Sequence, residues 1–143
     1  MRDVKAMTRH LFVYGTLRRM SQHPMARFLA ERASFVSEGT VPGKLYNLGR
    51  FPGMTEPAAL ADRVVGDVFH LGDGDDTIEE LDRYEGAESP LPSFFERGLA
   101  DVTLGDGRVV RALVYWFRGT VAETQRIESG DYRQMLAITP KLS

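Results

Sequence analysis

The segment from Phe94 to Phe117 constrains the fold of this chain more than any other. Residues 109–117 alternate two sets of side chains, with Val110, Ala112, Val114 and Trp116 forming one of them. Residues 94–104 alternate enough to form a second strand. Gly105-Asp106-Gly107 lies between the two and is typical of a hairpin turn. The sequence therefore predicts a long β-hairpin here.

Shorter strands and helices are predicted around this hairpin. Apolar and β-branched runs predict strands over 11–14, 35–41, 45–48 and 64–71. Helical spacing predicts a helix over 24–33. A second helix is predicted to follow the acidic turn at 72–76 and to end at Tyr84 or Glu85. Residues 127–136 are compatible with a third, short helix. Glycine and proline predict loops over 49–57 and 86–93. Many strands with few helices indicate an α+β fold, whose sheet can curl into a small barrel to remove its edges.

Composition fits one soluble globular domain over residues 1–143, with 1–9 as a mobile lead-in. The chain is 43% hydrophobic and 27% charged, and its net charge of −2 comes from scattered residues. This pattern excludes the basic stripe of a nucleic-acid-binding protein. No apolar run approaches the roughly 18 residues of a membrane span. The absence of cysteine excludes disulfides and a thiolate nucleophile, and it is compatible with the cytoplasmic location that we expect.

Leu81-Asp-Arg-Tyr-Glu-Gly86 holds the most informative candidate for catalysis, Glu85. Ile78, Leu81 and Glu85 follow one another at spacings of three and four, so they share one helix face. Since Ile78 and Leu81 must face the interior, Glu85 points toward low dielectric, and it lies near the helix C-terminus before Gly86. Desolvation and the helix dipole both raise the pKa of such a carboxyl group. A carboxyl group with a raised pKa suits general acid–base work near neutral pH, whereas the plain alternative is a glutamate that extends into solvent.

Tyr14-Gly-Thr-Leu-Arg18 forms a second motif, directly after the first strand. Gly15 lets a ligand approach the backbone closely, because no Cβ stands in the way. Successive backbone N–H groups at a strand end can hold a carboxylate, and Thr16 adds a hydroxyl donor. Alone, the motif is more typical of an ordinary strand-to-loop turn than of a binding site.

Together the two motifs resemble the γ-glutamylcyclotransferase-like family, which includes AIG2-like proteins and γ-glutamylamine cyclotransferases. The resemblance spans roughly residues 11–133. Further similarities are Leu48-Gly-Arg-Phe-Pro52, Val65-Gly-Asp-Val-Phe69, Val114-Tyr115 and Ser129-Gly-Asp-Tyr132.

The resemblance implies a small mixed β-barrel flanked by short helices, with a cavity at one side. It also implies that the backbone of Tyr14, Gly15, Thr16 and Leu17 cradles a γ-glutamyl substrate and that Glu85 moves the proton. In the implied reaction, the substrate's α-amino group attacks its own γ-carbonyl and releases 5-oxoproline and an amine. The nucleophile belongs to the substrate, so this reaction needs no cofactor and no metal. The leaving group is an amino acid, an ε-linked lysine, a polyamine or another amine.

One position departs from the family's pattern. Many relatives carry tyrosine, one residue and then arginine after the catalytic helix, whereas this chain reads Phe95-Glu96-Arg97. Phe95 lacks the hydroxyl of the family's tyrosine. If that hydroxyl contacts the substrate in relatives, the substrate specificity or the activity of this chain differs from theirs. Tyr115 offers another hydroxyl for substrate binding, although a half-buried strand aromatic is an equal interpretation.

Other candidates have plainer interpretations. His10, His23 and His70 lack metal-ligand spacing, and His70 is expected at the surface or rim. Asp73, Asp75 and Asp76 lack the full pattern of a calcium loop, and Asp82 diverges from Glu85 around the helix, which argues against a glycosidase pair. Arg18 and Arg50 could pair with a substrate carboxylate, although both are expected to be exposed, and exposed arginines usually make no such contact.

The sequence thus predicts a cofactor-independent γ-glutamylcyclotransferase-type enzyme whose partner is a small γ-glutamyl molecule. The main alternative is a non-catalytic module that binds a small carboxylate ligand in the same cavity. A third hypothesis, a protein-interaction scaffold, gives no reason for a glutamate on the buried face of the helix.

Overall fold

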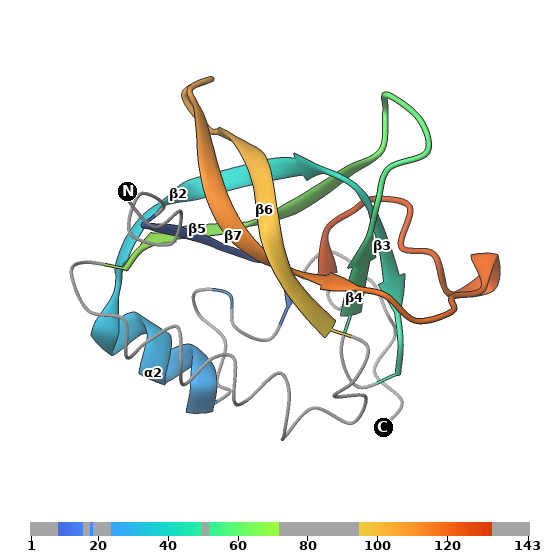
Figure 1. Cartoon of the computed structure of the whole chain (residues 1–143), viewed down its shortest axis with the longest axis horizontal. Coiled ribbons are helices and arrows are strands. Elements are labelled where there is room, and N and C mark those ends of the chain that lie inside the picture. The colour runs from blue at the N-terminus through green and yellow to red at the C-terminus, as the bar shows by residue number, and fades with distance from the viewer. Residues whose placement is uncertain (1–8, 16–17, 19–23, 50–51, 72–94, 133–143) are drawn as a thin grey trace, which may run out of the picture.

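Five strands of the protein close into a barrel in the computed structural model, which describes residues 9–15, 18, 24–49, 52–71 and 95–132 (Figure 1). The strands are β1 (His10–Val13), β2 (Ser34–Pro42), β5 (Arg63–His70), β6 (Phe95–Leu104) and β7 (Val109–Phe117). They are hydrogen-bonded in the order β1-β5-β2-β6-β7. The β1–β7 pair is parallel and closes the barrel, whereas the other pairs are antiparallel. The predicted α+β fold with a small mixed barrel is confirmed.

The long hairpin is formed by β6 and β7, as the alternation predicts. Its register runs without interruption from Phe95 opposite Phe117 to Thr103 opposite Val109. The turn is closed by a hydrogen bond from the Leu104 N–H to the Arg108 carbonyl, over 2.8 Å. Gly107 has a φ of 91° within that turn, a conformation that glycine adopts without a steric penalty.

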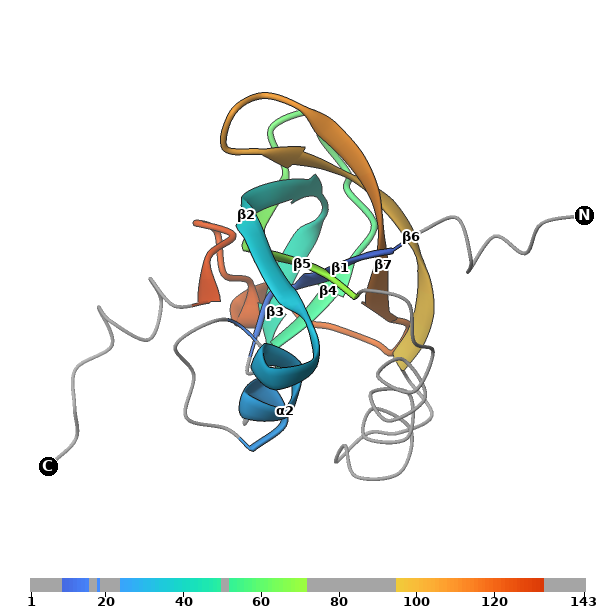
Figure 2. The ribbon, with the colours of Figure 1, turned by 90° about the vertical axis from the view of Figure 1, so that its left-hand side faces the viewer.

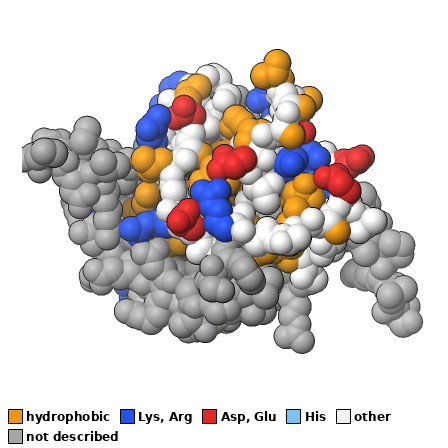
Figure 3. Space-filling model, turned by 45° about the vertical axis from the view of Figure 1, so that its right-hand side comes forward, with side chains coloured by type: hydrophobic (Ala, Val, Ile, Leu, Met, Phe, Trp, Pro, Cys, Tyr) orange, Lys and Arg blue, Asp and Glu red, His pale blue; other side chains and the backbone are white. Residues whose placement is uncertain are grey.

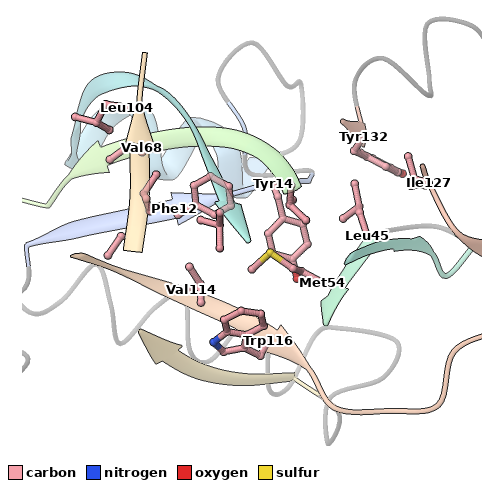
Figure 4. Packing of buried hydrophobic residues seen from close by; sticks show 14 residues of the cluster. Phe12, Tyr14, Leu45, Met54, Val68, Leu104, Val114, Trp116, Ile127 and Tyr132 are labelled. Carbon is pink, nitrogen blue, oxygen red and sulfur yellow. Dashed lines mark hydrogen bonds between the residues drawn. The ribbon is translucent and has the colours of Figure 1, made fainter. Parts of the chain in front are cut away.

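Alternation along the strands sorts apolar side chains into two clusters, one on each side of the barrel wall. The inner cluster is shown in Figure 4 and comprises Phe12, Tyr14, Val41, Leu45, Met54, Val64, Val68, Val102, Leu104, Ala112, Val114, Trp116, Ile127 and Tyr132. The outer cluster comprises Leu11, Val13, Leu29, Phe69, Leu71, Leu113 and Tyr115, with Ala33, Phe95 and Leu99 packed against it. The barrel wall is therefore apolar on both sides, and one helix covers part of its outer side.

That helix is α2 (Pro24–Arg32), which confirms the predicted helix over 24–33. It lies outside the barrel beside the start of β2 (Figures 1 and 2). Leu29 is fully buried in the outer cluster, and its carbonyl accepts a hydrogen bond from the Ala33 N–H over 2.9 Å. Among the residues that the structure describes, no helix combines the length and the apolar character needed to cross a bilayer.

The prediction of a loop over 49–57 is wrong in part, because Pro52–Thr55 forms strand β4. This strand pairs antiparallel with β3 (Lys44–Asn47), so that Leu45 lies opposite Met54. Pro52 is the first residue of the strand, a position that proline tolerates. Gly53 lies so close to Phe117 that a Cβ would meet the ring at 3.0 Å. Tertiary packing therefore imposes a strand on a sequence whose local composition indicates a loop.

The C-terminal segment also differs from expectation. A 3₁₀ helix spans Glu123–Gln125, and residues 127–130 form a turn in which the Gly130 N–H donates to the Ile127 carbonyl over 3.0 Å. The Ile127 N–H donates to the Leu45 carbonyl over 2.8 Å, so the backbone there is bonded to β3, and residues 127–131 are not helical, whereas Tyr132 is. Residues 133–136 of the predicted helix lie outside the described residues.

Candidate active site

The first element of the candidate site is Tyr14, which follows β1. Its side chain lies in the inner cluster, between Phe12 and Met54 in Figure 4. The hydroxyl donates a hydrogen bond to the Tyr115 carbonyl over 2.7 Å and accepts one from the Met54 N–H over 3.2 Å. The side chain of Tyr14 therefore ties together β1, β7 and β4. The role in substrate binding that the resemblance implies for Tyr14 concerns its backbone and stays a prediction.

Gly15 comes next and begins a tight turn. The Arg18 N–H donates a hydrogen bond to the Gly15 carbonyl over 3.1 Å. A Cβ on Gly15 would lie 2.7 Å from Cγ and 2.9 Å from Cδ of Pro52, which is too close for any side chain. Glycine thus lets the turn pack directly on the first residue of β4. Thr16 and Leu17, the other predicted binding residues, lie outside the described residues.

Arg18 ends the turn, and the expectation that it is exposed is wrong. Its side chain is 1% exposed. Nη1 lies 3.0 Å from Asp131 Oδ1, and Nη2 lies 3.3 Å from Asp67 Oδ1 and 3.4 Å from Glu38 Oε2. These carboxylates compensate for the desolvation of the guanidinium. They lie 20, 49 and 113 positions from Arg18, so no local pattern could reveal the burial.

Tyr115 lies on the other side of the barrel wall from the Tyr14 side chain. It is 6% exposed and belongs to the outer cluster together with Leu113 and Val13. The hydrogen bond from Tyr14 reaches its backbone, so the strand ends that carry the two tyrosines are adjacent. The structure thus brings Tyr14, Gly15 and the backbone of Tyr115 to one region of the barrel.

Phe95, which departs from the family's pattern, packs against the same outer cluster as Tyr115. Its ring contacts that of Phe117 edge-on, with centroids 5.3 Å apart. On the paired strands, Arg97 lies opposite Tyr115. A hydroxyl added to Phe95 would therefore project from the side of the wall that holds Tyr115.

Glu85 lies outside the described residues, as do Asp73, Asp75, Asp76 and Asp82, so its placement and its raised pKa remain predictions. The described residues that flank segment 72–94 are Leu71 and Phe95. Both pack in or against the outer cluster. The chain therefore enters and leaves this segment on the side of the wall where Tyr115 lies.

Among the residues that the structure describes, charged side chains of both signs are interspersed on the surface shown in Figure 3, with hydrophobic ones between them. His10 and His70 are cross-strand neighbours with ring centroids 5.4 Å apart, and His70 is exposed as expected. Within the described ranges, no group of three or more histidine, cysteine, aspartate or glutamate residues could hold a metal ion.

Comparison with known proteins gives one family and several similar folds. The sequence matches the family model described as gamma-glutamyl cyclotransferase, AIG2-like, over residues 11–134. No curated protein matches the chain in a search for relatives.

Solved structures with similar folds come from a mammal, an archaeon and a bacterium. An AIG2-like protein from Mus musculus is 21% identical with a TM-score of 0.68, and the match covers 94% of this chain and 97% of that one. An uncharacterised protein from Pyrococcus horikoshii is 21% identical with a TM-score of 0.64, and the match covers 90% and 92%. YkqA from Bacillus subtilis is 23% identical with a TM-score of 0.69, and the match covers 92% of this chain and 42% of that one. At these identities the likeness establishes the fold.

Proposed function

Because the chain belongs to the gamma-glutamyl cyclotransferase, AIG2-like family, we propose that it is a cofactor-independent γ-glutamylcyclotransferase. It would cyclise a γ-glutamyl amine or γ-glutamyl amino acid to 5-oxoproline and release the amine. The observation that carries the proposal is the closed turn from Gly15 to Arg18 at the end of β1, inside the matched segment. A fold alone does not assign an activity, so the turn and Glu85 are the features to test.

The proposed chemistry is an internal displacement. The substrate's α-amino nitrogen forms a bond to its γ-carbonyl carbon, and the bond from that carbon to the leaving nitrogen breaks. An α-ammonium group cannot attack, so Glu85 takes its proton and later delivers a proton to the leaving amine. General acid–base catalysis of this kind contributes about 10² to 10⁴ in rate.

Binding is proposed to rest on the backbone of Tyr14–Leu17. Backbone N–H groups at a strand end suit both a carboxylate and a developing oxyanion, because they are fixed dipoles that do not reorganise during the reaction. Holding the γ-glutamyl chain folded back on itself supplies the positional advantage. Tyr115 is proposed to contact the substrate from the outer side of the barrel wall.

The test is an assay for 5-oxoproline with the purified full chain. The substrates are a γ-glutamyl amino acid, ε-(γ-glutamyl)lysine and a γ-glutamyl polyamine. We expect product from at least one, and Glu85→Gln should lower kcat about 10²- to 10⁴-fold. Glu31→Gln is the matched control, since Glu31 is an exposed glutamate in the last turn of α2, and it should leave kcat unchanged.

Two results would overturn the proposal. Either no substrate gives 5-oxoproline, or Glu85→Gln retains full activity. Stable binding of a γ-glutamyl compound without turnover would instead identify a binding module.

A further inference from the structure

We propose that residues 123–132 form a strap that closes one end of the barrel and detaches as a unit while the five barrel strands stay paired. The strap comprises the 3₁₀ helix Glu123–Gln125 and the residues that follow it to Tyr132, including the turn at 127–130. Its departure opens the apolar end of the inner cluster to solvent and to apolar molecules. The inference concerns a motion of the fold, so it goes beyond the proposed function and does not depend on it.

The position of the strap is the first observation. It lies beside the β3–β4 hairpin, in the orange-red part of the ribbon (Figures 1 and 2). Ile127 and Tyr132 are buried, and both belong to the inner cluster. Figure 4 shows these two side chains beside Leu45, at the end of the cluster that lies opposite Leu104. They therefore cover one end of the apolar interior, which is uncovered when the strap leaves.

The second observation is that the strands of the barrel pair with one another without using the strap. All five strands precede it in the chain, since β7 ends at Phe117. The Ile127 N–H of the strap donates to the Leu45 carbonyl of β3 over 2.8 Å. The Gly130 carbonyl accepts a hydrogen bond from the Val65 N–H of β5 over 2.7 Å. Loss of these two bonds leaves the hydrogen bonds between the five strands in place.

Gly130 makes the close fit of the strap possible. Its φ of 71° lies in the left-handed region, which glycine adopts without a steric penalty. A Cβ on Gly130 would overlap the Arg63 carbonyl oxygen of β5. The strap therefore approaches β5 this closely because residue 130 has no side chain. A side chain at this position gives a direct means of detaching the strap.

Arg18 holds the strap to the barrel wall from a desolvated position. Its side chain is 1% exposed. Nη1 lies 3.0 Å from Asp131 Oδ1 on the strap, and Nη2 lies 3.3 Å from Asp67 Oδ1 on β5. A buried ion pair often contributes little net stability, because desolvation of the charges offsets their attraction. The contact thus determines where the strap sits and adds little to the free energy that holds it there.

Arg126 makes a second attachment of the same kind. Its Nη2 lies 3.0 Å from Asp62 Oδ1, in the loop before β5. The Nε atoms of Arg126 and Arg18 are both buried without a hydrogen-bond partner among the described residues. Detachment returns these two guanidinium groups to water, which offsets part of the free energy lost with the contacts. These charged attachments therefore favour local opening of the strap below the free energy of global unfolding.

Native-state hydrogen exchange of the wild-type chain is the first test, and it needs no substitution. The amides of Val65 and Ile127 both donate across the boundary of the strap, so their equilibrium constants for opening should agree within about twofold. Both constants should exceed those of amides in the β6–β7 ladder by about tenfold or more. Exchange that is no faster than in this ladder, or constants that differ about tenfold between the two amides, would overturn the inference.

Gly130→Ala and Gly107→Ala form a matched pair in the full chain. Gly107 also has a positive φ, of 91°, but nothing lies within 4 Å of a Cβ there. In Gly130→Ala, the amide resonances of residues 123–132 should move to unstructured positions, while those of the β6–β7 ladder stay in place. In Gly107→Ala, the strap resonances should stay. Strap resonances unmoved in Gly130→Ala, or global unfolding of that variant alone, would refute detachment as a unit.

Access to the interior is measured with the apolar dye anilinonaphthalene sulfonate. Its fluorescence should rise in Gly130→Ala and not in Gly107→Ala, because Leu45 loses the cover of Ile127 and Tyr132. Equal fluorescence in the two variants would show that the interior stays covered, which contradicts the proposed opening.

Asp131→Asn is a milder variant that removes the charge facing Arg18 and adds no bulk. The opening constants of the Val65 and Ile127 amides should both rise about tenfold or more, because Arg18 stays buried with a weakened partner. Asp101→Asn is the control, since Asp101 forms an exposed ion pair with Arg111 on the β6–β7 hairpin, and it should leave both constants unchanged. Constants in Asp131→Asn that match those of the control would exclude Arg18 as a holder of the strap.

Discussion

The Tyr14 hydroxyl donates a hydrogen bond to the backbone carbonyl of Tyr115 over 2.7 Å, across 101 positions of sequence. The same oxygen accepts a hydrogen bond from the Met54 N–H over 3.2 Å. One side chain thereby fixes the end of β1 against β7 and against the β3–β4 hairpin. The turn that begins at Gly15 follows directly, so its starting point is set by the barrel.

Replacing Tyr14 with phenylalanine should lower the free energy of unfolding by about 1–3 kcal/mol, because a buried carbonyl and a buried N–H each lose a partner. Urea denaturation measures the change. Tyr46→Phe is the control, since its hydroxyl donates over 3.3 Å to Glu123, an exposed residue, and it should cost less. Equal losses in the two variants would count against the structural role.

Gly66→Ala should destabilise the barrel by about 1–3 kcal/mol or more, since overpacking forces the backbone to shift. A Cβ at Gly66 would overlap the Val13 carbonyl oxygen and lie 2.6 Å from Cζ of Phe12. Gly105→Ala is the control, because its nearest neighbour would be Ser37 Oγ at 3.4 Å. The melting temperatures of the two variants give the comparison, and an unchanged melting temperature in Gly66→Ala would show that the strands can separate there without cost.

Stability should fall as the pH drops through about 6.5, partly because of His10. Burial lowers the pKa of His10, and the charges of His70 and Arg108 lower it further. The folded chain thus favours the neutral imidazole, while the unfolded chain takes up the proton near the ordinary pKa. The contribution of His10 to stability is fully present above pH about 6.5, the pKa of histidine in the unfolded chain. It is lost as the pH falls from there to the lower pKa of His10 in the folded state.

His10→Gln removes this titration, so urea midpoints measured from pH 7.5 to 5.0 should decline less steeply than in the wild type. His70→Gln should flatten the decline in part, since only one of the causes is removed. Parallel curves for wild type and His10→Gln would exclude His10 as a source of the pH dependence.

Phe95→Tyr should lower KM for a γ-glutamyl substrate about 2- to 10-fold, the effect of one added hydrogen bond. The expectation follows from the tyrosine that many relatives carry at this position. Phe35→Tyr is matched to it, because Phe35 is 38% exposed and its ring also contacts a neighbour edge-on, at 5.9 Å from Phe69. A KM that falls equally in both variants would show an effect unrelated to the site.

The long strand β7 could be predicted from the sequence because its two faces lie in different surroundings. In β7, Ala112 and Val114 face the inner cluster, while Leu113 and Tyr115 face the outer one. The two alternating sets of side chains in the sequence correspond to these two faces. β4 could not be predicted, since its pairing depends on the Tyr14 hydroxyl and on close packing at Gly53. Its own residues carry the signals of a loop.

The candidate site was predictable where chemistry lies in adjacent residues and not where it depends on distant ones. Tyr14-Gly15 marks the turn in the sequence, and the structure has a turn there. The burial of Arg18 depends on Asp67 and Asp131, which only the folded barrel brings near. The role of Glu85 stays a prediction.

The parallel pairing of β1 with β7 has a consequence for how the chain is made. Leu11 pairs with Leu113, so the nascent polypeptide must be synthesised past Leu113 before that partner exists. Until then β5 is the one partner of β1 among the described strands, and the row of backbone amides and carbonyls that later faces β7 is available to other strands. Chains that stop before β7 should therefore aggregate. Closure of the barrel by the pairing of β1 with β7 should be a late event during synthesis on the ribosome.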